Sequence, residues 1–269
     1  RHVEQANISA GDEPVLNVYD TPGLEDSRAL HAHIRKLQAK SRLSLPVQVL
    51  EHFVTHVAMN DPLEQEAKVI RQVLRSDILL YIIDVREPFL EKYRLELDIL
   101  TQAAKPIVPV FNFIAGHHQE LAQWRQNLAA YNMHATLEFD TVAFTFEAEK
   151  RLYQKMQTLV ETYYTPLQKL IDYRAKIWNQ LCLSSAKRIA DLIVSVACYR
   201  ENKLIKHHHI ADSLTEERLH DFVRKAEQRC LHDLLSLFNF LEKDIAIQNL
   251  PVSNGQWQLD IFAPGILKA

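Results

Sequence analysis

Two apolar segments with a helical segment between them restrict the fold of this chain most. Residues 77–85 (DILLYIIDV) and 105–113 (KPIVPVFNF) are apolar at successive positions rather than at alternate ones. Such runs are typical of strands that are buried on both faces of a parallel sheet. Residues 90–104 carry apolar side chains at helical spacing, and parallel strands need such a crossover. The sequence therefore predicts an α/β fold in which helices cover a sheet.

Further strands and helices extend this alternation in both directions. Residues 2–9 and 13–20 are strand-like and are separated by a turn that contains Gly11, which predicts an antiparallel hairpin. Residues 117–131 have a helical pattern, and we expect a further strand near residues 142–146. This order of strands and helices is typical of a doubly wound sheet.

Three polar side chains, Asp20, Asp84 and Asn112, stand where predicted strands end. Ligands of doubly wound sheets bind at the carboxyl ends of the strands, so we expect these side chains near a ligand site. For Asp84, two other roles stay open: a cap of the strand end, or a contact with Arg86. For Asn112, the other role is that of a turn residue at the strand end.

The pattern becomes helical in the second half of the chain. Residues 167–196 keep apolar side chains at a period near 3.6, which predicts one long amphipathic helix. A second helix is expected from Ser213, because Glu216 completes a capping box there. We expect the two helices to pair antiparallel and to bury their apolar stripes on each other.

The predicted domains are an α/β domain at residues 1–146 and a helical domain at residues 147–269. Within the first, residues 42–74 are expected to form two helices as an insertion ahead of the strand at residues 77–85. Such an insertion is suited to report the state of a nearby ligand site to a protein partner. The alternative is that it only adds packing.

Charge and composition exclude several classes of protein. A net charge of −3 without a clustered basic segment argues against a nucleic-acid partner. The longest apolar run, residues 189–199, is interrupted by Asp191 and is shorter than the roughly 20 residues that span a bilayer. The three cysteines have no metal-binding spacing, and we expect reduced thiols in a cytosolic protein.

The motif D-T-P-G at residues 20–23 carries the clearest chemistry. An aspartate at the end of a strand can hold Mg²⁺, usually through water. A glycine three residues later lets the backbone approach a terminal phosphate and donate its N–H. In an α/β pattern the motif therefore indicates a site for a Mg²⁺-bound nucleotide. The alternative is a turn in which Asp20 and Gly23 only shape the exit from the strand.

Several segments of the chain resemble a family of bacterial P-loop GTPases. DTPGLEDS at residues 20–27 is similar to the switch region of Era-like and EngA-like GTPases, and residues 75–88 resemble the strand that follows it. Together with PVFNFIA at residues 109–115 and DTVAFTFEAEKRLY at residues 140–153, they resemble a GTPase family with an uncharacterised C-terminal helical domain.

The resemblance implies a GTPase-like sheet that binds GTP or GDP with Mg²⁺. It assigns Asp20 to the metal and Gly23 to the γ-phosphate, and it makes Asn112 the remaining residue of the base-recognition motif. It implies a cytoplasmic protein, with attachment to the inner membrane only through sequence beyond Ala269. A protein partner is expected at the insertion or at the helical domain.

The chain also departs from this family in three places. None of its five glycines begins or ends the phosphate loop G-x-x-x-x-G-K-[ST], so we expect that loop and its strand to lie upstream of Arg1. The alternative is a degenerate relative that lacks the loop. Leu24 stands where many GTPases have a glutamine that orients water. Ala115 replaces the aspartate that selects guanine. No catalytic residue is assigned.

Two functions follow from these residues. The first is a GTP-binding switch with slow, Mg²⁺-dependent hydrolysis. The alternative is a non-catalytic relative of the GTPases that acts as an interaction or scaffold protein, with a membrane as one place where it would act.

Overall fold

The computed structural model describes residues 3–40, 43–58, 61–139, 145–200, 211–238 and 240, with side chains from residue 218 onward in the last helix. It is a mixed α/β structure with small sheets and a helical C-terminal region. The chain divides into two compact units, Arg1–Arg174 and Ala175–Ala269. The domain boundary predicted after residue 146 stays a prediction. The two compact units meet between Arg174 and Ala175, within a helix.

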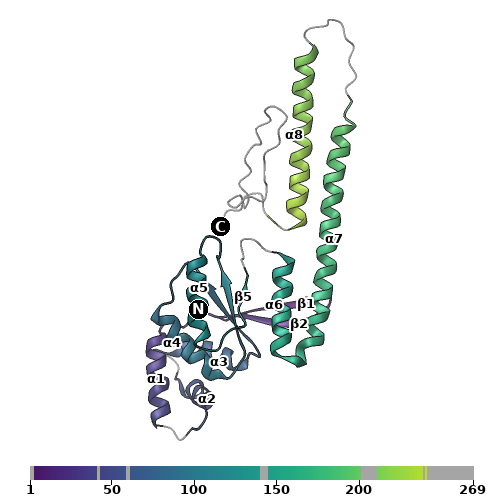
Figure 1. Ribbon diagram of the computed structural model, residues 1–269. Coiled ribbons are helices and arrows are strands. Elements are labelled where there is room, and N and C mark those ends of the chain that lie inside the picture. The colour runs from purple at the N-terminus through teal and green to yellow at the C-terminus, as the bar shows by residue number, and fades with distance from the viewer. Residues whose placement is uncertain are drawn as a thin grey trace. The chain divides into compact units, whose positions relative to one another are not determined.

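The first unit begins with a hairpin of strands β1 (Glu4–Ala10) and β2 (Glu13–Asp20). The strands pair antiparallel, as predicted, and Gly11 adopts a positive φ of 67° in the turn. An L side chain rarely adopts this conformation, so glycine suits the position. Half-buried side chains of the hairpin, including Ile8 and Leu16, pack against helices α6 (Phe146–Leu159) and α7 (Tyr164–Ala197). Figure 1 shows the two strands beside α6 and the start of α7.

The second sheet is parallel and has the order β3-β4-β5. Its strands are β3 (Leu79–Asp84), β4 (Ile107–Asn112) and β5 (Leu137–Glu138), and the connecting helices are α4 (Glu91–Leu100), the 3-10 turn η1 (Thr101–Ala103) and α5 (His118–Ala129). One face packs against α4 and α5 around Phe111, Leu97 and Trp124. The other face packs against α6 around Val108 and Val110. These buried runs confirm the predicted α/β class.

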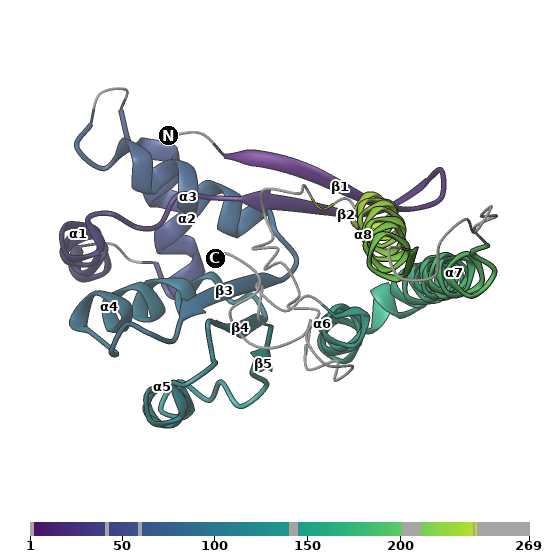
Figure 2. The ribbon, with the colours of Figure 1, turned by 90° about the horizontal axis from the view of Figure 1, so that it is seen from above.

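Two details of the predicted α/β order need correction. Asp20 was expected in the same sheet as Asp84 and Asn112, but β2 and β3 belong to separate sheets and share no ladder of hydrogen bonds (Figure 2). The strand expected near residues 142–146 is also wrong at its end, because Phe146 begins α6. Thr145 caps that helix, and its side chain accepts a hydrogen bond from the amide of Ala148 at 3.3 Å. Residues 140–144 lie outside the described residues.

One face of the edge strand β3 is more exposed than the same face of β4. Leu80 lies opposite Val108 in the register, and Ile82 lies opposite Val110. The two valines are buried, whereas Leu80 is 36% exposed and Ile82 is 61% exposed. Among the described residues, helix α6 therefore covers β4 and β5 on this face but not β3.

Three helices fill the connection between β2 and β3: α1 (Ser27–Lys40), α2 (Pro46–His56) and α3 (Glu64–Arg75). The latter two are the helices predicted for the insertion. Proline begins α2, where its missing N–H costs no hydrogen bond. The side-chain oxygen of Gln48 accepts a hydrogen bond from the amide of Leu45 at 3.3 Å. The three helices share one core, which includes Leu30, Phe53 and Ile70.

The first turns of α7 are tied to α6 by a buried carboxylate. Glu149 accepts hydrogen bonds from the guanidinium of Arg174, at 2.9 and 3.2 Å, and from the hydroxyl of Tyr153 at 2.8 Å. The α6–α7 connection passes through the 3-10 turn η2 (Glu161–Tyr163). Burial and the hydrogen bond to Glu149 raise the pKa of Tyr153.

The second unit contains the rest of α7, from Ala175, and helix α8 (Ala211–Leu237). The helices pair antiparallel as predicted, because Trp178 meets Phe238 at one end and Tyr199 stacks on Phe222 at the other. Helix α8 begins two residues before the predicted start at Ser213, and the side chains of the predicted capping box lie outside the described residues.

Mutual burial of the apolar stripes in this unit is only partial. Among its described residues, Ala226 and Leu235 are the buried apolar side chains. The three cysteines of the chain are free, as predicted. In the described residues no helix combines the length and the apolar character needed to cross a membrane.

Candidate functional site

The D-T-P-G motif forms the exit from β2, where the chain turns toward α1. Asp20 ends the strand and is exposed, and within the described residues no cation forms an ion pair with it. Leu24, by contrast, is 7% exposed and belongs to the core of α1, α2 and α3. The motif thus presents a carboxylate to solvent, and the residue that follows the motif is anchored in the core.

Gly23 lies between these two residues in an open position. Its φ is not in the left-handed region, and a Cβ placed on it would have no heavy atom within 4 Å. Neither backbone strain nor packing within the described residues therefore requires a glycine here. Gly23 is also exposed, so a ligand could approach its backbone closely.

Asp26 fixes the far end of the segment. Its carboxylate accepts a hydrogen bond from the amide of Ala29 at 2.8 Å and so caps the first turn of α1. Its own amide donates to the carboxylate of Glu66, on α3, at 3.0 Å. Sequence reasoning missed Glu66. A signal was present, because Glu66 shares a helix face with the apolar residues Val69, Ile70 and Val73.

Asp84 is held by Arg86 at the carboxyl end of β3. The guanidinium donates to both carboxylate oxygens, at 2.7 and 2.9 Å, and this pairing lowers the pKa of Asp84 below its ordinary value of 3.8. Arg86 also lies over the ring of Phe113, 3.9 Å from its centre. Of the alternatives for Asp84, the contact with Arg86 is confirmed.

Asn112 lies beside Asp84 in the register of β3 and β4, so the structure brings these two predicted residues together. Its side-chain oxygen accepts the amide of Phe113 at 2.9 Å. Phe113 itself has a φ of 56°, a region that bulky residues rarely adopt. Asn112 therefore stabilises a turn at the strand end, which is the other role that the sequence left open. Asp20 lies on the other sheet.

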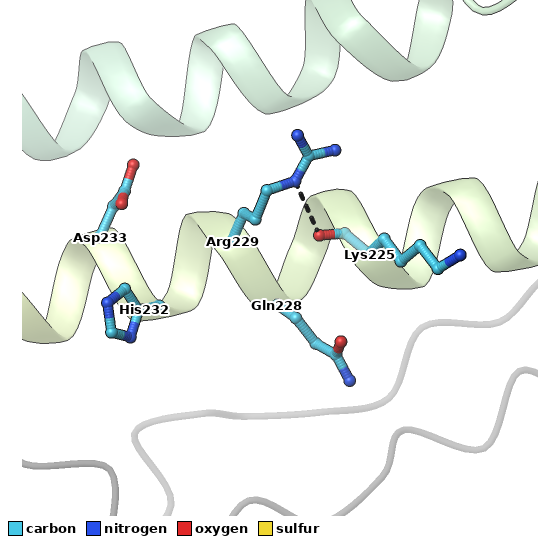
Figure 3. A pocket seen from close by; sticks show the side chains of 5 residues that line it. All are labelled: Lys225, Gln228, Arg229, His232 and Asp233. Carbon is cyan, nitrogen blue, oxygen red and sulfur yellow. Dashed lines mark hydrogen bonds between the residues drawn. The ribbon is translucent and has the colours of Figure 1, made fainter.

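Metal-binding clusters and surface hollows are the other places where a ligand could bind. Within the residues that the structure describes, no group of three or more His, Cys, Asp or Glu side chains could hold a metal ion. A shallow hollow on α8 is lined by Lys225, Gln228, Arg229, His232 and Asp233 (Figure 3).

The side chains of this hollow do not converge. Arg229 and Asp233 point to one side of the helix, and Gln228 and His232 point to the other (Figure 3). Arg229 donates to the carbonyl of Lys225 at 3.2 Å, and Asp233 pairs with Arg188 of α7 at 3.3 Å. These contacts stabilise helices and assemble no reactive group.

Comparisons with known proteins give one result. No curated protein and no solved structure matches the chain. The model of the family described as a domain of unknown function (DUF3482) matches residues 125–269, which is more than half of the chain. The chain therefore belongs to the DUF3482 family.

Proposed function

We propose that this chain is part of a GTP-binding switch with an Era-like or EngA-like P-loop GTPase fold. The observation that carries the proposal is the geometry of Asp20 and Gly23. An exposed carboxylate, with no ion pair among the described residues, ends a strand, and an open backbone position follows three residues later. Asp84, which could compete for the metal role, is already paired with Arg86.

The residues fit a Mg²⁺-nucleotide. Mg²⁺ prefers few protein ligands and keeps several waters, so a single exposed carboxylate suffices on the protein side. The N–H of Gly23 is the donor for a terminal phosphate oxygen, and the bound group would supply the charge that organises residues 20–26. Leu24 is buried and apolar, so it positions no water, and hydrolysis is slow.

The phosphate loop of this switch is supplied by sequence outside residues 1–269. The position of β3 supports this, because it is an edge strand of its sheet among the described residues and a further strand could pair along it. The protein acts in the cytoplasm, and the α2–α3 insertion or the helical domain binds its protein partner. Selectivity for guanine is weak, because Ala115 offers no acceptor to the base.

Substitution of Gly23 and Asp20 in the full-length protein tests the proposal. Gly23→Ala should leave the melting temperature unchanged, because the added methyl group meets open space. It should weaken GTP binding at least tenfold, because the methyl group occupies the approach to the amide and a hydrogen bond to a charged group is lost. Asp20→Ala should abolish the Mg²⁺ dependence of binding and turnover.

The matched control is Asp12→Ala, which removes an exposed aspartate from the turn of the same hairpin. It should change neither binding nor turnover. GTP affinity and Mg²⁺ dependence that are the same in all four proteins would refute the assigned site.

The second candidate is a non-catalytic interaction protein with the same fold. Two observations favour it. Leu24 is part of the core, and the side-chain oxygen of Asn112 accepts a hydrogen bond from the amide of Phe113. Single-turnover measurements separate the two candidates. Nucleotide binding without phosphate release over hours would favour the interaction protein.

A further inference from the structure

Glu66 is a buried carboxylate with one hydrogen bond and no ion pair among the described residues. It is 4% exposed and lies on α3, on the face that carries Val69 and Ile70 into the core. One of its oxygens accepts the amide of Asp26 at 3.0 Å, forty residues away in the sequence. Burial of a carboxylate is costly, so an apolar residue would suit this face better if packing were its only role.

The partner of Glu66 explains what this carboxylate does. Asp26 is the last residue before α1, and its own carboxylate already caps that helix. Leu24 is anchored in the core that α3 shares. The segment after Asp20 is therefore open at Gly23 and fixed at Asp26. A ligand that binds at Gly23 and moves the segment there will therefore act on the hydrogen bond between the amide of Asp26 and Glu66.

Helix α3 can pass such a change to α2. The two helices share one core, which includes Phe53 of α2 and Ile70 of α3. The guanidinium of Arg71 also donates to the carbonyl of Val54 at 3.0 Å. A shift of α3 therefore acts on the end of α2 through both packing and a hydrogen bond.

We propose that Glu66 is a positioning residue that couples the D-T-P-G segment to the α2–α3 insertion. The coupling rests on the function proposed above, because its input is nucleotide at Asp20 and Gly23. The coupling changes the position of α2 and α3, so the insertion is the element that a partner protein recognises.

Amide hydrogen exchange of the free protein tests the contact without any nucleotide. Glu66→Leu should speed exchange in residues 21–31 at least tenfold, while β3 and β4 exchange as in the wild type. Glu66→Gln keeps an acceptor oxygen of the same size, so it should stay within threefold of the wild type. Glu51→Leu, which changes an exposed glutamate on α2, should have no effect.

A spectroscopic measurement covers the case in which Glu66→Leu does not fold. The amide proton of Asp26 should resonate downfield in the wild type, because its acceptor is charged. Glu66→Gln should move this signal upfield, and Glu51→Gln should not. An unmoved signal, or unchanged exchange in residues 21–31 of a folded Glu66→Leu, would refute the role of Glu66.

The link to nucleotide is tested in the full-length protein. GTP should slow exchange in α2 and α3 of the wild type and of Glu66→Gln, but not of Glu66→Leu. If the wild type binds no GTP, the proposed function fails and the link fails with it, while the exchange result without nucleotide still decides the contact itself. If GTP binds and protects α2 and α3 equally in all three proteins, the coupling is refuted although the proposed function stands.

Discussion

The two compact units differ in how much of their apolar surface they bury. In the first unit, helices cover sheets and one another, and side chains such as Leu97, Phe111 and Trp124 are shielded almost completely. In the described residues of the second unit, Ala226 and Leu235 are buried, whereas Leu183 is 72% exposed. The described helices of the second unit therefore form no comparable core with each other.

The comparison teaches that helical pattern and helical stability are separate properties. An amphipathic sequence forms a helix when its apolar face is covered, and most helical stability in proteins comes from that covering. Helix α7 has a second set of exposed apolar side chains, which includes Leu183, Ile193 and Val194. Each helix of the pair thus covers only part of the other.

The largest expected difference is in local stability. Amides of β4 should be protected from hydrogen exchange at least a hundredfold more than amides of α7 after Ala175, because opening the pair of helices exposes little buried surface. Exchange followed by mass spectrometry measures both in one sample. Equal protection in the two regions would show that the helical pair is covered by contacts outside the described residues.

Matched leucine truncations sharpen the comparison. Leu97→Ala should lower the free energy of unfolding by about 2–5 kcal/mol, because it leaves a cavity in a closed core. Leu192→Ala, on the half-buried face of α7, should cost less than about 1 kcal/mol. Denaturant unfolding, followed by the fluorescence of the buried Trp124, measures the first, and circular dichroism measures the second. Equal losses would contradict the difference in burial.

The buried carboxylate between α6 and α7 gives an intermediate effect. Glu149→Gln leaves the guanidinium of Arg174 without its ion pair in a partly buried place, and should cost about 2 kcal/mol. Glu147→Gln removes an exposed carboxylate that pairs with Lys150 one turn away on the same helix, and should cost less than about 0.5 kcal/mol. Thermal unfolding compares the two. A similar loss for both variants would show that burial gives the Glu149 pair no added strength.

The smallest effect concerns pH. Arg86 lowers the pKa of Asp84 in the folded protein below its ordinary value of 3.8, so the contact stabilises the fold above pH 3.8 and this stability is lost as pH falls through the lower, folded value. Carboxyl chemical shifts should give a midpoint for Asp84 below 3.8. Arg86→Leu should raise the midpoint toward 3.8. A titration midpoint of Asp84 that is the same in the wild type and in Arg86→Leu would show that Arg86 does not stabilise the carboxylate.

Much of the fold could be predicted from local patterns. The hairpin, β3, β4 and the insertion helices follow from apolar periodicity and from Gly11, since each depends on neighbours in the sequence. The separation of β2 from β3 could not be predicted, because pairing between strands depends on which other strand lies between them. In place of the predicted doubly wound sheet, the structure has two smaller sheets.

The candidate site was predicted in part for the same reason. The roles left open for Asp84 and Asn112 depended on neighbours two residues and one residue away, Arg86 and Phe113. Their chemistry was visible in the sequence, but the choice among roles needed side-chain geometry. Glu66 was missed because its partner, Asp26, lies forty residues away. Only its place among apolar residues on one helix face hinted at a role.

The most direct test of the nucleotide site is a calorimetric titration of GTP with Mg²⁺ into two proteins, the full-length protein and residues 1–269. Without a phosphate loop, Asp20 and Gly23 leave the α- and β-phosphates without donors, so residues 1–269 should bind no tighter than the millimolar range, about −4 kcal/mol. The full-length protein should bind in the micromolar range, about −8 kcal/mol, and lose this affinity in Asp20→Ala. Millimolar or weaker binding by the full-length protein, or micromolar binding that survives Asp20→Ala, would contradict the proposed site.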